Sequence, residues 1–428
     1  MAIKYWLGGI VGIGAAGLVG ANLYADQQLK DFYQPKEANS KFFQVTTNSL
    51  NLGAFSGEAD YTLSIIPDPC NPKDKLDLHI QDKISRQLNG YKIESTLVLP
   101  NELEKSLQPY FSGQAPVAAS SHVSWLGNID VKITSPAIDY KKDNEYLQSK
   151  GAVLEFATQR KDLKMLKDVH FVMPSFVARN DKSYLALDQL ELKADQMHYS
   201  KILPKSSSTL TLNQFKLNTY DKVPIDINMQ QFNLASESKI SDKQFSIHNE
   251  FRIAKFKLPN SDDAGRVDLN FDVKNLDAEK LQVLLDELDN YGEQCNATAQ
   301  SEEKMQHAVL ALLEQGFKFE SKDNAIVLGD TRLNAHLDGA LAQAKYQDMD
   351  ALAKNIANNV QLSGQMDSSK AFVRETLKMI PVLASQADNE RVVDELLRGF
   401  QMQGFLKVEG DKLSSKFEYK AGKPRFIN

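Results

Sequence analysis

Apolar and polar residues alternate along much of the chain between residues 42 and 274. The clearest run is VDLNFDV, whose apolar positions are Val267, Leu269, Phe271 and Val273. A period of two with one polar face predicts half-buried strands, most naturally antiparallel ones. We expect these four side chains to lie on the apolar face of the sheet, either in its core or along a groove.

The alternation changes parity inside several of these runs. The apolar pairs that mark the changes are Leu212 and Phe215, Met229 and Phe232, and Ile253 and Phe256. A change of parity within one strand is what a β-bulge produces. Long strands interrupted in this way predict a strongly twisted or curved sheet. Short helical interruptions are expected at Asn101–Tyr110 and at Lys161–Lys167.

After Lys274 the spacing of apolar residues becomes helical. Asp277 can cap a first helix, and Ser301 can cap a second one that ends at Gly316. Further helices are expected over residues 346–358, after Asp367 and after Asp388, with strands between them. The segments VDLNFDVKNLDAEKLQVLL and LALLEQGFKFE are echoed later by VQLSGQMDSSKAFVRETLKM and ELLRGFQMQGFLKVE, which indicates an internal repeat.

These patterns predict an α+β protein with a long, curved, mainly antiparallel sheet and strand–helix–helix repeats in the C-terminal third. The predicted parts are a transmembrane anchor at 1–25, a linker at 26–41, a β-rich region at 42–274 and an α+β region at 275–428.

The anchor is predicted from the segment between Trp6 and Tyr24, which carries no charged side chain. A helix of this length reaches roughly 28 Å, close to the thickness of a bilayer's hydrocarbon core. A cleavable signal peptide is the alternative, but the apolar run is long and no A-x-A site follows it. The positive-inside rule places Lys4 in the cytoplasm and the body of the protein outside it.

Small residues recur every four positions in this segment, at Gly8, Gly12, Ala16 and Gly20. Such a stripe lets two membrane helices approach closely, which would make the protein a homodimer. The alternative is that the repetition reflects only the high frequency of glycine and alanine in membrane helices.

Composition narrows the classes of function. Basic and acidic residues are mixed throughout, with a formal net charge of -6 and no basic block, so nucleic-acid binding is not predicted. The two cysteines, Cys70 and Cys295, lie in turn-forming surroundings. In an exported protein they are expected to form one disulfide, and two separate thiols are the alternative.

No motif for catalysis stands out. The seven histidines are scattered without paired spacing, so no metal site is predicted. The chain has no nucleophile elbow and no phosphate-binding loop. The glycines at positions 8–20 belong to the predicted anchor and cannot bind a phosphate. We therefore predict a non-enzymatic protein without a cofactor.

Three segments carry a resemblance to known proteins: SPAID at Ser135–Asp139, KNLDAEKLQVLL at Lys274–Leu285, and VEGDKLSSKFEYKAGK at Val408–Lys423. With them the chain resembles the YdgA/YihF-like family of bacterial envelope proteins of unknown function. The resemblance implies a Gram-negative inner-membrane anchor and a periplasmic body, and it supplies no catalytic residues because the family has no assigned chemistry. At the level of architecture alone, the chain is also similar to AsmA-like envelope proteins, whose curved sheets handle lipids on an apolar inner face.

Three functions follow as hypotheses. In the first, the protein maintains the envelope by binding lipid or another hydrophobic ligand on the amphipathic sheet. In the second, it is a dimeric scaffold that engages other envelope proteins through strand edges or helices. The third is a hydrolase that uses dispersed residues, which is disfavoured because no motif supports it.

Overall fold

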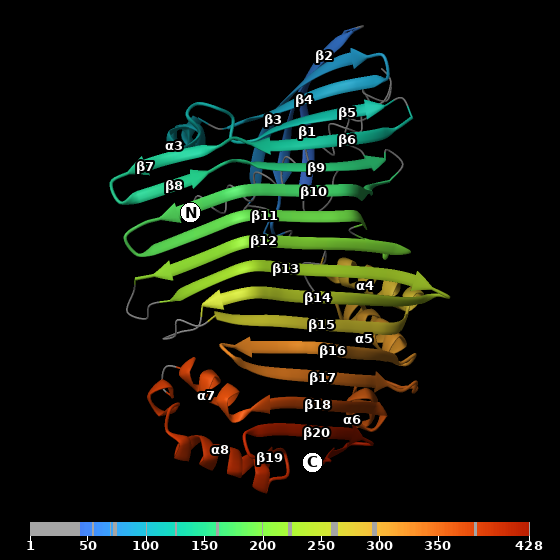
Figure 1. Ribbon diagram of the computed structural model, residues 1–428. Helices are drawn as coiled ribbons and strands as arrows, with labels where there is room; N and C mark the ends of the chain where they lie inside the picture. Colours follow the sequence, from blue (N-terminus) through green and yellow to red (C-terminus); the bar gives the residue numbers. More distant parts are fainter. Residues whose placement is uncertain are drawn as a thin grey trace. The chain divides into compact units, whose positions relative to one another are not determined.

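The computed structural model (Figure 1) describes residues 43–427 except for 54, 69, 72–74, 100, 125, 160–161, 199, 221–224, 258–263, 293–297 and 381–382. The predicted anchor and linker lie outside the described residues. Among the described helices, none is both long enough and apolar enough to cross a membrane. Within the same residues, the predicted combination of antiparallel sheet and C-terminal helices is confirmed.

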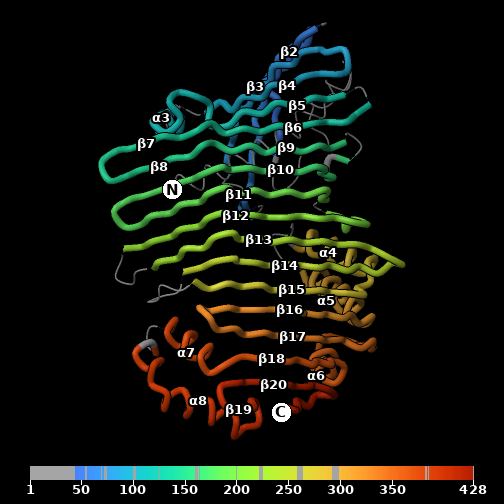
Figure 2. Tube along the Cα trace, viewed as in Figure 1, coloured from blue at the N-terminus to red at the C-terminus, as the bar shows by residue number. Residues whose placement is uncertain are grey.

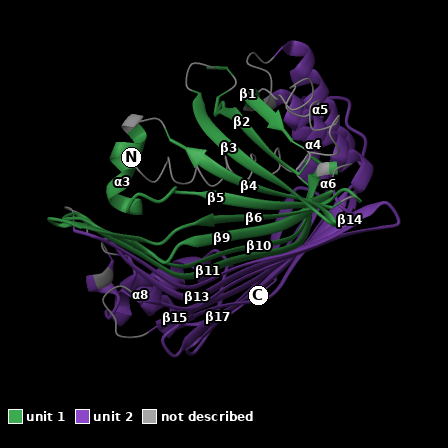
Figure 3. Cartoon of the chain, turned by 90° about the horizontal axis from the view of Figure 1, so that it is seen from above, with its two compact units in different colours: residues 1–200, 292–296 green, residues 201–291, 297–428 purple. Residues whose placement is uncertain are grey.

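The chain divides into two compact units, coloured separately in Figure 3. The first comprises residues 1–200 and 292–296, and the second comprises residues 201–291 and 297–428. The predicted change from strands to mixed structure at residue 274 lies within the second unit, near the end of a strand.

The first unit is an antiparallel sheet with one described helix. Its elements are β1 (Phe43–Leu52), β2 (Ser56–Ile65), β3 (Leu76–Gln87), β4 (Gly90–Val98), α3 (Asn101–Phe111), β5 (Ala118–Ser124), β6 (Asn128–Ser135), β7 (Ile138–Lys142), β8 (Glu145–Ser149), β9 (Ala152–Gln159), β10 (Asp162–Arg179) and β11 (Ser183–His198). Strands β1 to β6 pair in sequence order, followed by β9, β10 and β11, while the β7–β8 hairpin pairs with one end of β10. The path can be followed in Figure 2.

One of the two predicted helical interruptions in this unit is confirmed and the other is wrong. The helix expected at Asn101–Tyr110 is α3. The helix expected at Lys161–Lys167 is instead the beginning of β10, where Leu166 lies opposite Thr158 of β9 and Met197 of β11. Pairing on both sides of this strand outweighs the local spacing of apolar residues.

The apolar face of the first unit is enclosed. Strands β1 to β3 cross behind β5 to β10 in Figure 1, and the view from above in Figure 3 agrees. The resulting core draws on strands from β1 to β11, and Tyr61, Leu63, Ile93 and Ile129 are 0% exposed in it. The sheet therefore supplies both walls of its own core.

The second unit is an antiparallel sheet with helices at the ends of its strands. Its elements are β12 (Lys205–Thr219), β13 (Asp226–Ser241), β14 (Gln244–Lys257), β15 (Ala264–Asp277), α4 (Ala278–Gly292), α5 (Ala299–Leu313), β16 (Phe317–Leu328), β17 (Thr331–Leu341), α6 (Met349–Asn359), β18 (Val360–Ser369), α7 (Lys370–Lys378), the 3₁₀ turn η1 (Ala384–Gln386), α8 (Glu390–Met402), β19 (Lys407–Glu409), β20 (Lys412–Lys420) and β21 (Lys423–Phe426). Strands β12 to β18 pair in sequence order, β20 follows β18, and β19 and β21 both pair with β20.

Strand direction explains where the helices lie. β15 continues directly into α4, and β18 continues directly into α7. Three antiparallel pairings separate β15 from β18, so these two strands run in opposite directions. The helices that follow them must therefore lie at opposite ends of the strands, as Figure 1 shows for α4 and α7. Both stretches have the order strand, helix, helix, strands that the internal repeat predicts.

The helix starts were predicted to within a few residues. Asp277 caps α4 as expected, because its side chain accepts a hydrogen bond from the Lys280 N–H at 3.0 Å. Ser301 does not cap α5. Thr298 does so, and the Ser301 hydroxyl accepts a hydrogen bond from the Thr298 N–H at 2.9 Å to complete a capping box. The helices expected after Asp367 and Asp388 begin after Ser369 and Asn389.

The changes of parity occur where they were predicted. Across β12 and β13, Leu212 pairs with Phe232 and Phe215 pairs with Met229, so both strands change parity at the same place. Gln231, which lies between the two pairs, has a φ of 52°. Between β14 and β15 the register itself shifts after Ile253. These irregularities let long strands bend while keeping their apolar residues on one face.

Candidate functional site

Rows of apolar side chains cross the strands of the second unit. Directly opposed residues of antiparallel strands point to the same face, so the pairing register identifies each row. One row contains Leu210, Leu234, Phe251 and Leu269, and a second contains Leu212, Phe232, Ile253, Val267 and Ile326. We call these two rows, together with Phe271 and Val273, the apolar strip. The strip is continuous from β12 to β16.

The apolar strip is only partly covered. Among the residues of β12, β13 and β14, all of which the structure describes, none is buried. Leu234, Leu269 and Phe271 are 37%, 40% and 44% exposed. Aromatic rings still contact one another across the strands, with 5.4 Å between the centroids of Phe232 and Phe251. The strip is thus an ordered apolar surface that is open to solvent.

All four residues predicted for the apolar face lie on β15. Val267, Leu269 and Val273 are directly opposite Ile253, Phe251 and Ile247 of β14. In the same register, the fourth residue, Phe271, lies directly opposite Asn249, so a polar side chain interrupts the apolar face at this point. Val267 and Val273 are half-buried, whereas Leu269 and Phe271 are exposed.

Helices border the apolar strip at the ends of the strands. At one end, Phe372 of α7 packs with Ile326 and Leu333 and covers that part of the face. At the other end, α4 is held by the Gln282 side chain, which accepts a hydrogen bond from the Ile202 N–H at 2.8 Å. Helix α4 itself exposes apolar side chains, namely Val283, Leu285 and Leu288, at 37–50%.

Glycines on the same face lie beneath aromatic rings of neighbouring strands. A Cβ added at Gly265, Gly339 or Gly364 would overlap the ring of Phe256, Phe319 or Phe417 respectively. The rings cover backbone that a larger residue would otherwise cover, which is a known way to stabilise a glycine within a strand. These three pairs keep the face apolar and smooth where β15, β17 and β18 lack side chains.

The opposite face of the second unit is polar and carries ion pairs. His248 contacts Glu250 at 3.1 Å and Asp272 at 2.8 Å. The hydrogen bond to Glu250 raises the pKa of His248 above its ordinary value, with a further increase from Asp272, while partial burial opposes the rise. Lys274 bridges to Glu320 at 2.7 Å on the next strand. Charged side chains on this face favour contact with water, so an apolar ligand would bind on the opposite face, which carries the apolar strip.

Polar groups also lie inside the first unit. Asp82 and Ser95 are 1% and 2% exposed, and they lie directly opposite each other on β3 and β4. Burial raises the pKa of the nearby Tyr61 phenol well above its ordinary value, and the Asp82 carboxyl raises it further, whereas a hydrogen bond with Ser95 lowers it. These groups lie deep in the enclosed core, so we assign them to the internal packing of the unit.

A pocket of about 300 Å³ lies between the end of β4 and α3. Its apolar lining includes Leu97, Leu107 and Phe111, and Glu104 lies at its wall. This volume is at the lower end of the range for small-molecule sites.

Other predicted positions lie wholly or partly outside the described residues, so the disulfide and the stripe stay predictions. Cys70 lies in an exposed turn, where its N–H donates to the Asp68 carboxylate at 2.8 Å, while Cys295 lies outside the described residues. The glycine stripe (Gly8, Gly12, Ala16 and Gly20) also lies outside them. Within the described part of the chain, no group of three or more His, Cys, Asp or Glu side chains could hold a metal ion.

The alternation in the sequence identifies one strand of the apolar strip, β15, but not the extent of the strip. Leu234, Phe251 and Ile326 belong to the same surface as Leu269 but lie on other strands. Their alternation was visible in the sequence. Only the pairing register shows that the separate runs form continuous rows, and only the packing shows that the rows remain open.

Comparison with known proteins identifies the family of the chain. No curated protein and no solved structure matches the chain. The sequence model of a bacterial protein family of unknown function, DUF945, matches residues 4–426, which is nearly the whole chain. The chain therefore belongs to the DUF945 family of bacterial proteins.

Proposed function

We propose that the second unit binds a lipid or another hydrophobic ligand on the apolar strip, without catalysis or a cofactor. The observation that carries this proposal is the exposure of Leu234, Leu269 and Phe271 in the middle of a continuously paired sheet. Soluble proteins rarely leave a contiguous apolar surface open unless it contacts a ligand, a partner or a membrane. The strip stays open from β12 to β15, so an elongated apolar molecule could contact it across four strands.

The energetics favour a covered strip. Fully burying a leucine or phenylalanine side chain contributes about 1.5–3 kcal/mol. Because Leu269 and Phe271 are already more than half covered, a ligand would gain about 1 kcal/mol from each of them. The combined gain from several such side chains offsets part of the entropic free-energy cost of binding.

The proposal includes a setting for the protein. We infer that it is one of the YdgA/YihF-like envelope proteins, held in the inner membrane by residues 6–24 with its body in the periplasm. The apolar anchor sequence and the family membership support this setting. In this setting the strip would serve envelope maintenance, and the stripe of small residues in the anchor would form a homodimer.

Native mass spectrometry of the detergent-purified full-length protein, followed by lipid extraction, tests the proposal. The test variant is the double substitution Leu269→Asn/Phe271→Asn, and the matched control is Leu88→Asn/Leu126→Asn, which changes two side chains that are 103% and 91% exposed. We expect stoichiometric lipid on the wild type and the control, and its loss from the strip variant.

The control separates the strip from lipid held around the anchor, which both variants retain. Equal amounts of lipid on the strip variant and the wild type would contradict the proposal. A dimer without bound lipid would contradict it as well, and would favour the scaffold that engages other envelope proteins.

A further inference from the structure

Polar side chains interrupt the apolar face of the second unit where β12, β13 and β14 lie side by side. Ser208 lies directly opposite Ser236, and Ser236 lies directly opposite Asn249 on the next strand. Ser238 follows two residues later on β13 and therefore points to the same face. We call these four residues the polar patch.

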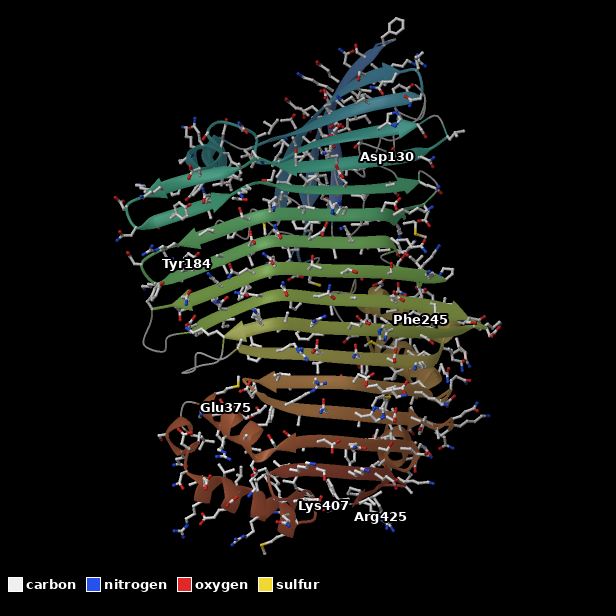
Figure 4. All side chains as sticks on the ribbon, in the orientation of Figure 1. Asp130, Tyr184, Phe245, Glu375, Lys407 and Arg425 are labelled. Atoms are coloured by element: carbon white, nitrogen blue, oxygen red, sulfur yellow. The ribbon has the colours of Figure 1, made fainter. Side chains whose placement is uncertain are left out.

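Apolar rows border the polar patch on both sides along the strands. On one side, about 7 Å away along each strand, is the row of the apolar strip that begins with Leu210. On the other side, Ile240 lies opposite Phe245, and Phe245 lies opposite Leu276. Figure 4 shows Phe245 at the end of β14. The patch is therefore a polar area within an apolar surface, and not the beginning of the polar rim of the sheet.

The polar patch lies in the open part of this face. All four of its residues are half-buried. Leu234 and Phe271, which flank it, are 37% and 44% exposed, and Phe271 lies directly opposite Asn249. A ligand that lies on the apolar strip would therefore reach the patch as well.

The hydrogen-bonding groups of the polar patch are not used by neighbouring residues. Its three serines and Asn249 form no side-chain hydrogen bond with any residue that the structure describes. Asn324, in the same sheet, instead donates to the Ser321 hydroxyl at 2.9 Å and to the Ala335 carbonyl at 3.2 Å. The patch thus keeps donors and acceptors that a bound molecule can use.

The chemistry of the polar patch favours an uncharged polar group. A serine hydroxyl and an asparagine amide can each donate and accept a hydrogen bond. The rows that contain or border the patch on β12 to β15 carry no charged residue. A phosphate or carboxylate group would lose its hydration here without a cation to pair with, which is costly. An ester carbonyl or a hydroxyl group loses less and can form hydrogen bonds with the patch.

We propose that the ligand of the second unit is an uncharged acyl ester of glycerol. Its acyl chain lies along the apolar strip, and its ester and hydroxyl groups form hydrogen bonds with the polar patch. This inference rests on the proposed function of the strip. It adds the class of the polar group and the direction in which the ligand lies.

The test is native mass spectrometry of the detergent-purified full-length protein with two ligands that have the same acyl chain. The ligands are 1-monomyristoylglycerol and myristate, added together in equal amounts at ~pH 8, where the carboxyl group of myristate is ionised. The ratio of the two bound masses gives the relative affinity. We expect the wild type to bind the glycerol ester about tenfold more tightly, which corresponds to one or two net hydrogen bonds.

The variant Ser208→Ala/Ser236→Ala/Asn249→Ala removes the hydrogen-bonding groups and leaves the apolar strip in place. It should weaken binding of the glycerol ester about tenfold. Binding of myristate should change less than about twofold, because its carboxylate stays in water. Retained binding of myristate also shows that the variant is folded.

The matched control is Ser241→Ala/Ser246→Ala/Asn233→Ala, which changes the same residue types on the opposite face of β13 and β14. Binding of both ligands to the control should equal binding to the wild type. The strip variant Leu269→Asn/Phe271→Asn should weaken binding of both ligands, because it removes the surface that their acyl chains share.

The outcomes separate this inference from the proposed function. If the strip variant loses both ligands but the patch variant binds the glycerol ester as the wild type does, this inference is overturned and the proposed function stands. Tighter binding of myristate by the wild type, or equal losses of both ligands in the patch variant, would also overturn it. Binding of neither ligand to the wild type would contradict both.

Discussion

The two units share one pattern of alternating apolar and polar residues, but the apolar face is enclosed in the first unit and open in the second. Both are antiparallel, and both place apolar residues on one face of each strand. In the first unit that face is enclosed by the sheet itself, and Leu63 and Ile93 are 0% exposed. In the second unit the corresponding face stays open across β12 to β15, and Leu269 is 40% exposed.

The difference shows that alternation determines which face is apolar, whereas the neighbouring elements determine whether that face becomes a core. The first unit has β1 to β3 to cover its own sheet (Figure 3). The second unit has helices instead, and α7 covers only the part of the face around Ile326 and Leu333. What remains uncovered is the part of the apolar strip on β12 to β15, which we interpret as a ligand-binding surface.

The largest expected contrast is between matched leucine truncations. Leu63→Ala should reduce the free energy of unfolding by about 2–5 kcal/mol, because it removes a fully buried side chain and leaves a cavity. Leu269→Ala should cost about 1 kcal/mol or less, since its side chain is 40% exposed. Urea unfolding of the full chain measures both losses. Equal losses would show that the strip is as tightly packed as the core.

The next contrast uses glycines. Gly339→Val should destabilise the protein by about 1–3 kcal/mol, because the new side chain displaces the ring of Phe319. Gly399→Ala is the control: nothing lies near an added Cβ there, and alanine in α8 should stabilise the protein by up to about 1 kcal/mol. Thermal unfolding separates the two signs. A neutral Gly339→Val would mean that the ring does not cover the glycine.

The smallest expected effect concerns pH. Because the folded-state pKa of His248 is raised by Glu250 and Asp272, its contribution to stability is present in full below the ordinary histidine pKa and is lost as the pH rises through the raised value. His248→Gln should therefore destabilise the protein by a few tenths of a kcal/mol at low pH and by less at high pH, since the site is partly exposed. An NMR titration of His248 should give a pKa above the ordinary value, and a lower one would contradict this account.

The fold was predictable where local chemistry decides it. Asp277 caps α4 because a carboxylate can accept from the first turn, and that signal is visible in the sequence. The start of α5 was misplaced, because Thr298 and Ser301 are both competent caps and only the backbone shows which one is used. The helix expected at Lys161–Lys167 is a strand, because partners distant in sequence pair with β10 on both sides.

The candidate site was predictable only in part. The alternation of Val267, Leu269, Phe271 and Val273 identifies an apolar face, but the same pattern occurs around Ile93, where the face is buried. Whether a face is closed depends on contacts between elements that are far apart in the sequence.

We propose that the second unit, and not the first, offers its apolar face to a ligand. The most direct measurement is photo-crosslinking of the full-length protein with a diazirine-labelled fatty acid, followed by peptide mapping with mass spectrometry. We expect labels on β13, β14 and β15, within residues 226–277, and none on β2, β3 or β4, within residues 56–98. Labels on the strands of the first unit, or none on residues 226–277, would contradict it.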